Sequence, residues 1–329
     1  MGGCMSRKTG TFDPQKDLND LTGKIAIVTG ANTGIGYHTV KFLARKGARV
    51  YLGARNKSKA MAAISQLEEE GIGPGQVVWL GINLSDPRWA KEAAEEFLGK
   101  ESRLDILINN AAQLTGAYEE TNDGINSIMV TNHFSPFVFT RTLLPLLIRT
   151  SHEPGSDVRI ISLGSIAHTQ SRALSPDLKF KGLEDFNLEF ASDFYPDWSR
   201  YSITKLACIL FARELQKRLD EQKIPILSIP IHPGEVNTFG DRTPWPFLAN
   251  IVMELFFMRP EPGSYTSCFA AASPVVRNFP AKYKHAYLEP VGHVGEMSAN
   301  AKRDDLASDL WETTERILDD LGIDIPSFN

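Results

Sequence analysis

Short apolar runs alternate with longer amphipathic stretches from Lys24 onward. A short apolar run bounded by polar residues or glycine is typical of a strand that is buried on both faces. The pattern predicts six strands, with a seventh near 285–288. The six cover residues 24–29, 49–53, 77–81, 104–109, 158–163 and 226–230.

Between these runs, apolar residues recur at helical spacing, which predicts amphipathic helices. The helices cover residues 35–46, 58–70, 87–100, 122–149 and 197–220, and a C-terminal helix covers 306–321. Strands that alternate with helices form parallel sheets with right-handed crossovers, so helices cover both faces. The sequence therefore predicts an α/β fold: a single Rossmann-type doubly wound domain with a mostly parallel seven-stranded sheet.

A chain of 329 residues is long enough for about two domains. No low-complexity linker divides it, which favours one domain over residues 21–329 after a flexible leader of residues 1–20. Two stretches, 173–196 and 239–263, interrupt the alternation of strands and helices. We expect loops over a binding site there, and the second stretch, rich in apolar residues, is predicted to be a substrate lid. A core or dimer helix is the alternative for that stretch.

The composition excludes several classes of protein. The chain is 42% hydrophobic and 23% charged with a formal net charge of -5, so it has no basic field for nucleic acid. Cys4, Cys208 and Cys268 are far apart, and no histidine or cysteine spacing fits a metal site. The sequence predicts a small-molecule partner, no nucleic acid, no metal and a cytoplasmic location. It leaves homo-oligomerisation open.

The N-terminus has two interpretations. Gly2 and Ser6 stand at the positions of a myristoylation signal, and Cys4 with the Arg7/Lys8 pair supplies a second membrane signal. The other interpretation is an unmodified leader. No apolar run has the length that a spanning helix needs. Any membrane contact is therefore expected to be peripheral, through acylation of Gly2 and Cys4.

A glycine-rich turn follows the first strand and precedes a helix. Strand, glycine turn and helix occur in the order that dinucleotide binding requires, because glycines let the backbone approach the pyrophosphate at the helix N-terminus. The spacing is G-x-x-x-G-x-G. The cofactor-binding residues predicted here are Gly30, Asn32, Thr33, Gly34, Ile35 and Gly36. A purely structural glycine turn is the alternative.

The end of the second strand predicts which cofactor binds. A carboxylate there would accept hydrogen bonds from the adenosine ribose, but the chain has Arg55 and no acidic residue. A guanidinium suits a 2'-phosphate, so we expect NADP(H) in preference to NAD(H). Asn83, just past the third strand, is expected to bond the adenine edge. The alternatives for Arg55 are a solvated surface charge and a guanidinium that only stacks on the adenine.

Tyr201 and Lys205 are spaced i and i+4, so they lie on one face of one helix. A neighbouring ammonium stabilises a phenolate, which makes such a tyrosine a usable acid and base. Ser165 ends an apolar strand at the sheet edge where ligands bind, although a helix-capping serine is the alternative. After the last long strand, Pro233, Val236 and Thr238 are expected to face the nicotinamide carboxamide.

In this order the motifs resemble those of the classical short-chain dehydrogenases/reductases, over about residues 21–272. They are T-G-x-x-x-G-x-G at Thr29 to Gly36, N-N-A at Asn109 to Ala111, Asn132, Ser165, Tyr201 with Lys205, and P-G at Pro233. Details such as Asn132-His133 and Ser165-Ile166-Ala167-His168 are similar to the retinol-dehydrogenase-like branch. Ala112 and Gly164 depart from the usual pattern.

The resemblance implies a catalytic tetrad of Asn132, Ser165, Tyr201 and Lys205, and cofactor contacts at Asn110, Ala111, Tyr201 and Lys205. It predicts an NADP(H)-dependent oxidoreductase that acts on a carbonyl or alcohol of a lipophilic small molecule of retinoid, steroid or terpenoid type. A tailoring enzyme of a secondary-metabolite pathway is one alternative. A catalytically silent cofactor-sensing regulator is the alternative from another class.

Overall fold

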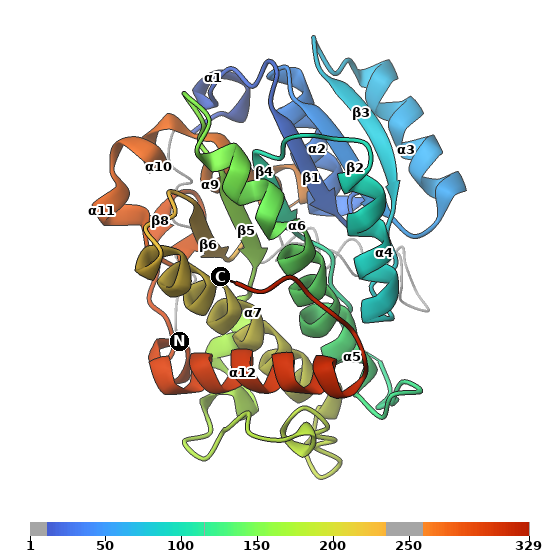
Figure 1. Ribbon diagram of the computed structural model, residues 1–329, viewed down its shortest axis with the longest axis vertical. Helices are drawn as coiled ribbons and strands as arrows, with labels where there is room; N and C mark the ends of the chain where they lie inside the picture. The colour runs from blue at the N-terminus through green and yellow to red at the C-terminus, as the bar shows by residue number, and fades with distance from the viewer. Residues whose placement is uncertain (1–11, 115, 235–258, 329) are drawn as a thin grey trace, which may run out of the picture.

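The computed structural model describes residues 12–114, 116–234 and 259–328. Its centre is one sheet with the strand order β3-β2-β1-β4-β5-β6-β7-β8, parallel except for β8 (Figure 1). The strands are β1 (Ile25–Thr29), β2 (Arg49–Ala54), β3 (Gln76–Gly81), β4 (Ile106–Asn109), β5 (Arg159–Leu163), β6 (Leu227–Ile231), β7 (Leu288–Glu289) and β8 (His293–Val294). The order reverses between β1 and β4, and such a switch point opens a crevice at the carboxyl ends of the strands.

Helices cover both faces of the sheet. Successive residues of β1 enter different cores: Ile25 and Ile27 pack on one face, Ala26 and Val28 on the other. The first face is covered by α4 (Pro87–Leu98), α6 (Ser135–Ser151), α7 (Pro196–Glu221) and, outside α7, α12 (Asp304–Asp320). The second face is covered by α2 (Gly34–Arg45), α3 (Lys57–Glu70) and α9 (Pro260–Ala272). This arrangement confirms the predicted α/β architecture.

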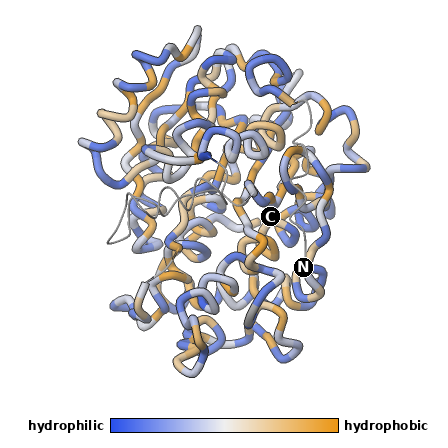
Figure 2. The backbone as a smooth tube through the Cα atoms, turned by 180° about the vertical axis from the view of Figure 1, so that it is seen from behind, coloured by the Kyte–Doolittle hydropathy of each residue, from blue (hydrophilic) through white to orange (hydrophobic). Residues whose placement is uncertain are grey.

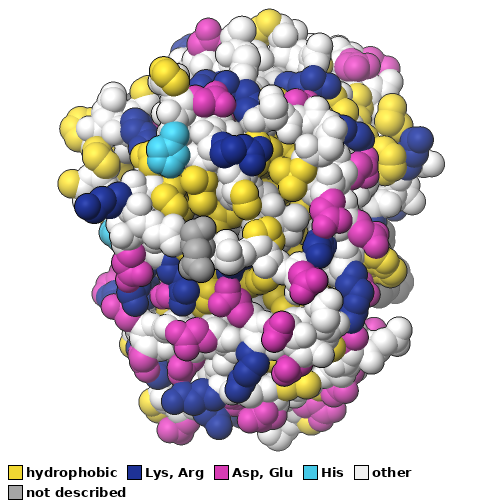
Figure 3. Space-filling model, in the orientation of Figure 1, with side chains coloured by type: hydrophobic (Ala, Val, Ile, Leu, Met, Phe, Trp, Pro, Cys, Tyr) yellow, Lys and Arg dark blue, Asp and Glu magenta, His cyan; other side chains and the backbone are white. Residues whose placement is uncertain are grey.

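Smaller elements complete the described chain. They are the helices α1 (Pro14–Asp17), α5 (Ser127–Met129), α10 (Pro274–Asn278) and α11 (Pro280–Tyr283), a π turn (Val130–Phe134), and single 3-10 turns at Ile166–Thr169, Ser171–Leu174, Leu183–Asp185 and Asn300–Lys302. In Figure 2 the hydropathy alternates along the outer helix α3, as expected for a helix with one face in water. Acidic and basic side chains are interspersed over the face in Figure 3.

Two predictions about elements need correction. The sheet has eight strands, not seven, because β8 adds a two-residue antiparallel edge that is too short to give an apolar pattern. The long helix begins at Ser127, not at residue 122. Before it, Thr121 N donates to Ile125 O (2.8 Å) and Gly124 has a φ of +71°, so the chain turns, and the Asn126 side chain then caps the helix.

The predicted leader is too long at its C-terminal end. Residues Pro14–Asp17 form α1, Leu18 is buried, and Asn19 N donates to Ala272 O at 3.1 Å. The Phe12 ring packs edge-on against Phe269. The rest of the leader, with Gly2 and Cys4, lies outside the described residues. In the part of the chain that the structure describes, no helix is long and apolar enough to span a bilayer.

Most of the predicted substrate lid, residues 239–258, also lies outside the described residues. Its C-terminal end is described, and residues 260–263 form the first turn of α9. The predicted C-terminal helix is confirmed as α12, which buries Leu306, Leu310 and Trp311 against the body of the domain.

Candidate active site

The glycine turn after β1 is shaped for close approach of a ligand. Gly30 and Gly34 both have a φ of +63°, which favours glycine. A Cβ on Gly36 would lie 2.6 Å from Asn110 Nδ2 and 2.8 Å from Gly30 O. Thr33 is the N-cap of α2, yet its side chain makes no capping hydrogen bond. The first-turn amides of α2 are therefore uncapped by side chains, as a bound pyrophosphate requires.

The loop after β4 holds this turn in place. Asn110 Nδ2 donates to Thr29 O (2.7 Å) and Gly30 O (3.2 Å). The main-chain amides of Asn110 and Ala111 both donate to Thr29 Oγ1 at 3.0 Å. Asn110, predicted as a cofactor contact, thus uses its side-chain amide to position the turn. Ala112 is exposed and is not among the described residues with positive φ, so its methyl group strains no backbone.

The end of the crevice predicted to take the adenosine lies at β2 and β3, which are paired up to Ala54 and Gly81. Arg55 follows β2 directly; it is exposed, and its side chain has no hydrogen bond or ion pair among the described residues. Asn83 follows β3, and its Oδ1 accepts from Ser85 N (3.2 Å) and Ser85 Oγ (2.9 Å). Only the amide nitrogen of Asn83 is left to bond an adenine edge. Asn32 and Ile35 are half-buried and Thr33 is exposed.

Tyr201 and Lys205 lie one turn apart on α7, as the spacing predicts. Lys205 Nζ is 5.6 Å from the centre of the Tyr201 ring, and both residues are buried. Lys205 Nζ donates to Leu163 O at the end of β5 (2.7 Å), which holds the ammonium at the sheet edge. Two of its three N–H donors remain free for a ligand.

Ser165 follows β5 and caps the turn Ile166–Thr169. Its Oγ accepts from Ala167 N at 3.2 Å, so the hydroxyl proton is free to be donated outward. The predicted alternative, a capping serine, is therefore also realised. His168 fixes the Ser165 backbone: its Nδ1 lies 2.6 Å from Ser165 O, and its Nε2 accepts from Ser298 N at 3.2 Å. Burial lowers the pKa of His168, which keeps the ring neutral in this arrangement.

Asn132 lies in the π turn before α6 and joins two distant segments. Its Nδ2 donates to Gln113 O (2.8 Å) and to Thr204 Oγ1 (3.0 Å), and its Oδ1 accepts from Gln113 N (2.7 Å). It thus links the loop after β4 to α7 one residue before Lys205. The main-chain carbonyl of Asn132 accepts a hydrogen bond from Cys208 Sγ at 3.3 Å.

The Tyr201 ring has apolar surroundings. It is buried with Ile128 and Ala167, and the half-buried side chains of Leu114 and Trp198 pack on this group. The ring centres of Trp198 and Tyr201 are 5.4 Å apart. A substrate oxygen that reaches the phenol would therefore arrive beside hydrocarbon.

Comparisons with known proteins show the family to which this geometry belongs. The family model described as short chain dehydrogenase matches residues 24–176. A short-chain dehydrogenase/reductase of Armillaria gallica is 47% identical over 309 residues, which are 92% of this chain and 95% of the relative. The chain belongs to the short-chain dehydrogenase/reductase family. It is therefore an oxidoreductase of a family that uses NAD(P)(H) and acts on small molecules.

Two further matches refine the position of this short-chain dehydrogenase/reductase. Retinol dehydrogenase 14 of Mus musculus is 33% identical over 309 residues, 90% of this chain and 86% of the relative. This confirms the retinol-dehydrogenase-like branch. The solved structure of the Pseudomonas aeruginosa RhlG/NADP active-site complex has a TM-score of 0.60 at 25% identity, covering 84% of this chain and 97% of that chain.

In this short-chain dehydrogenase/reductase, the residues predicted to face the nicotinamide carboxamide follow β6. Pro233 lies just beyond the carboxyl end of β6 and is half-buried, whereas Val236 and Thr238 lie outside the described residues. Gly164, which departs from the usual family pattern, packs against α7, where an added Cβ would lie 3.0 Å from Ile209 Cγ1. The position therefore suits a residue without a side chain.

Among the described residues, no group of three histidine, cysteine or acidic side chains has a geometry for a metal.

Several residues of the site were not found from sequence. Gln113, Leu114 and Thr204 stand next to recognised motif residues, but nothing in their own type indicates a role. Trp198 precedes Tyr201 by three residues on the same helix. Only this spacing indicates from the sequence that the two rings are neighbours.

Proposed function

We propose that this protein is an NADP(H)-dependent oxidoreductase that interconverts a carbonyl and an alcohol on a lipophilic small molecule. The observation that carries the proposal is the buried pair of Tyr201 and Lys205, with the phenol among apolar side chains. An ammonium group one helical turn from a phenol suits proton exchange with a substrate oxygen. The proposed tetrad is Asn132, Ser165, Tyr201 and Lys205.

The cofactor would be held by the turn from Gly30 to Gly36 and by Lys205. The close contacts at Gly36 and the uncapped start of α2 suit a pyrophosphate. When bound, a reduced nicotinamide supplies the hydride for the carbonyl carbon, and the protein's part is to orient the reactants and move the proton.

Tyr201 Oη would give its proton to the substrate oxygen during reduction and take it back during oxidation. The Lys205 ammonium would stabilise the phenolate that remains. The Ser165 oxygen accepts from Ala167 N, and among the described residues its hydroxyl donates to no acceptor, so it would donate to the same substrate oxygen, where negative charge develops.

Asn132 would hold in place the main chain along which protons pass to solvent. Both hydrogens of its amide and one lone pair of its oxygen are used within the protein. A water that passes protons to solvent would therefore be held by its main-chain carbonyl. The side chain would act by fixing the π turn to Gln113 and Thr204.

The preference for NADP(H) rests on Arg55. Its guanidinium is exposed at the end of β2 and has no partner among the residues that the structure describes, and the sequence offers no carboxylate there for a ribose diol. Lys57 lies over the Trp79 ring at 5.4 Å and adds positive charge nearby. The lipophilic substrate class is supported by the apolar side chains of Ile128, Leu114 and Trp198, and it agrees with the name of the relative retinol dehydrogenase 14.

The test follows NADPH and NADH absorbance with a panel of lipophilic aldehydes and ketones. We expect turnover with NADPH and weaker turnover with NADH. Equal use of both cofactors would contradict the preference for NADP(H). Tight NADPH binding without turnover of any carbonyl would contradict the enzyme and favour the cofactor-sensing regulator.

A further inference from the structure

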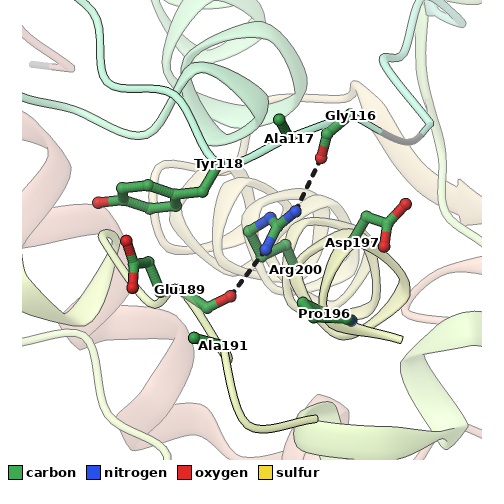
Figure 4. Close-up of a pocket in the computed structure, with 8 residues that line it drawn as sticks. All are labelled: Gly116, Ala117, Tyr118, Glu189, Ala191, Pro196, Asp197 and Arg200. Carbon is green, nitrogen blue, oxygen red and sulfur yellow. Dashed lines mark hydrogen bonds between the residues drawn. The ribbon is translucent and has the colours of Figure 1, made fainter. Parts of the chain in front are cut away.

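A pocket of about 330 Å³ opens at the start of α7 (Figure 4). Three segments that are far apart in sequence build it: the loop after β4, the insertion between β5 and α7, and the first turns of α7. Its lining residues are Gly116, Ala117, Tyr118, Glu189, Ala191, Pro196, Asp197 and Arg200. None of these was predicted as a site residue.

The pocket is next to the proposed catalytic centre. Asp197 and Tyr201 are spaced i and i+4, so both project from the same face of α7. Helical side chains lean toward the N-terminus of their helix, which for Tyr201 is the end that carries the pocket. On the opposite wall, Gly116 stands two residues after Leu114, which packs on the cluster around the Tyr201 ring.

Arg200 is a buried charge whose two hydrogen bonds go to main-chain carbonyl groups. One terminal nitrogen donates to Glu189 O and the other to Gly116 O, each at 2.7 Å. The residue is only 7% exposed. Among the described residues it has no ion-pair partner. A guanidinium has five N–H donors, so three remain after these two bonds. Figure 4 shows it between the two carbonyl groups, in the middle of the lining.

Two acidic side chains of the pocket are also unpaired. Within the described part of the chain, the carboxylates of Asp197 and Glu189 have no hydrogen bond or ion pair. The Tyr118 phenol is already occupied, since it donates to Glu120 Oε1 at 2.6 Å. The pocket therefore offers strong acceptors on two sides of a strong donor, with Ala117, Ala191 and Pro196 as apolar lining.

This combination selects the chemistry of a ligand. A carboxylate or phosphate would face two like charges, and an ammonium group would face Arg200. A hydroxyl group accepts from a guanidinium and donates to a carboxylate at the same time. We propose that the pocket is the substrate subsite for a hydroxyl group remote from the reacting carbon. This inference rests on the proposed carbonyl reductase function, and it narrows the substrate to lipophilic ketones or aldehydes that carry a second hydroxyl.

The test compares a lipophilic keto-alcohol with its deoxy analogue. Asp197→Ala and Glu189→Ala are the informative variants, because Arg200 holds two loops and its loss would disturb folding. Because a hydroxyl donates only one hydrogen bond, we expect the kcat/KM ratio of keto-alcohol to deoxy ketone to fall by about tenfold in Asp197→Ala, at a residue on the same face of α7 as Tyr201, and to change less in Glu189→Ala. A fall of about tenfold is the size expected when a hydrogen bond to a charged group is lost. Asp177→Ala, at an exposed carboxylate of the same insertion, is the matched control and should leave the ratio unchanged.

Calorimetric titration of both ligands into NADPH-loaded Tyr201→Phe protein separates the two proposals. That variant lacks the phenol proton donor, so it reports binding without turnover. Tighter binding of the keto-alcohol, lost with Asp197→Ala added, supports the subsite even if the wild type reduces neither ketone. Equal affinities together with an unchanged kcat/KM ratio would overturn the subsite, while turnover of the deoxy ketone by the wild type would still support the proposed function.

Discussion

The cofactor half and the substrate half of the site are held together by different means. The cofactor half, at the ends of β1 to β3 with residues 110–112, is fixed by close main-chain packing, such as Gly30 against Ala111, and by the short side chains of Thr29 and Asn110, which bond neighbouring main-chain groups. The substrate half, formed by residues 113–118, the insertion after β5 and α7, is joined by side chains: Asn132 to Thr204, and Arg200 to two loops. Main-chain contacts leave little freedom for change, whereas side-chain joints can be exchanged to suit a different substrate.

The largest expected effect is on the substrate half. Tyr201→Phe removes the proposed proton donor and leaves the apolar ring in place. We expect kcat to fall about 1000-fold, within the range for loss of a positioned general acid. NADPH affinity, measured by calorimetry, should stay within a factor of about two, since the glycine turn is untouched. A fully active variant would remove Tyr201 from the mechanism.

The second prediction concerns a substitution that disturbs the glycine turn of the cofactor half. Gly36→Ala places a Cβ at 2.6 Å from Asn110 Nδ2 and 2.8 Å from Gly30 O, and the main-chain atom cannot rotate away. We expect the free energy of unfolding to fall by about 1 to 3 kcal/mol. We expect kcat/KM for NADPH to fall by about 100-fold, because a turn displaced by about 1 Å misplaces the reactants.

Gly99→Ala is the matched control for Gly36→Ala. Gly99 ends α4 with a φ of -73°, and its added Cβ would lie 3.6 Å from the nearest atom, Glu96 O. Urea unfolding and NADPH kinetics should both be near wild type. Similar losses in the two variants would contradict the idea that close packing fixes the cofactor half.

The same contrast explains what could be predicted from sequence. The glycine turn and the Tyr201/Lys205 pair lie within single short segments, so local spacing identifies them. The bonds Asn132 to Thr204 and Arg200 to Gly116 join residues 72 and 84 positions apart, and no local periodicity reports such contacts. The edge strand β8 was missed for a related reason, since two residues carry no period.

A smaller effect is expected at the adenosine end of the cofactor half. Arg55→Ala should raise the KM for NADPH about tenfold and leave that for NADH unchanged, because a guanidinium–phosphate bond is charge-assisted. Lys59→Ala, at an exposed lysine in the first turn of α3, is the control and should change neither value. Parallel losses with both cofactors would instead make Arg55 a general contributor to stability.

The smallest effect is a pH dependence of stability that arises from two buried histidines beside the site, outside both halves. Burial lowers the pKa of His133, beside Asn132, to about 3, and burial with His168 and Lys205 nearby lowers the pKa of His232 to about 4. In the unfolded chain an imidazole titrates near a pKa of about 6.5. Between these values the unfolded chain binds protons that the folded chain excludes, so stability is full above about pH 6.5 and is lost as the pH falls.

Urea unfolding at several pH values between 7 and 5 measures this loss, which we expect to be about 1 kcal/mol per pH unit for each of the two histidines. His133→Asn should flatten the slope, although it also removes the bond between His133 Nε2 and Thr314 Oγ1 (2.8 Å) and lowers stability at neutral pH. His293→Gln, at an exposed position of β8, should keep the full slope. An unchanged slope in His133→Asn would mean that acid acts elsewhere. A flattened slope would make the buried neutral imidazole of His133, next to Asn132, a source of the acid sensitivity.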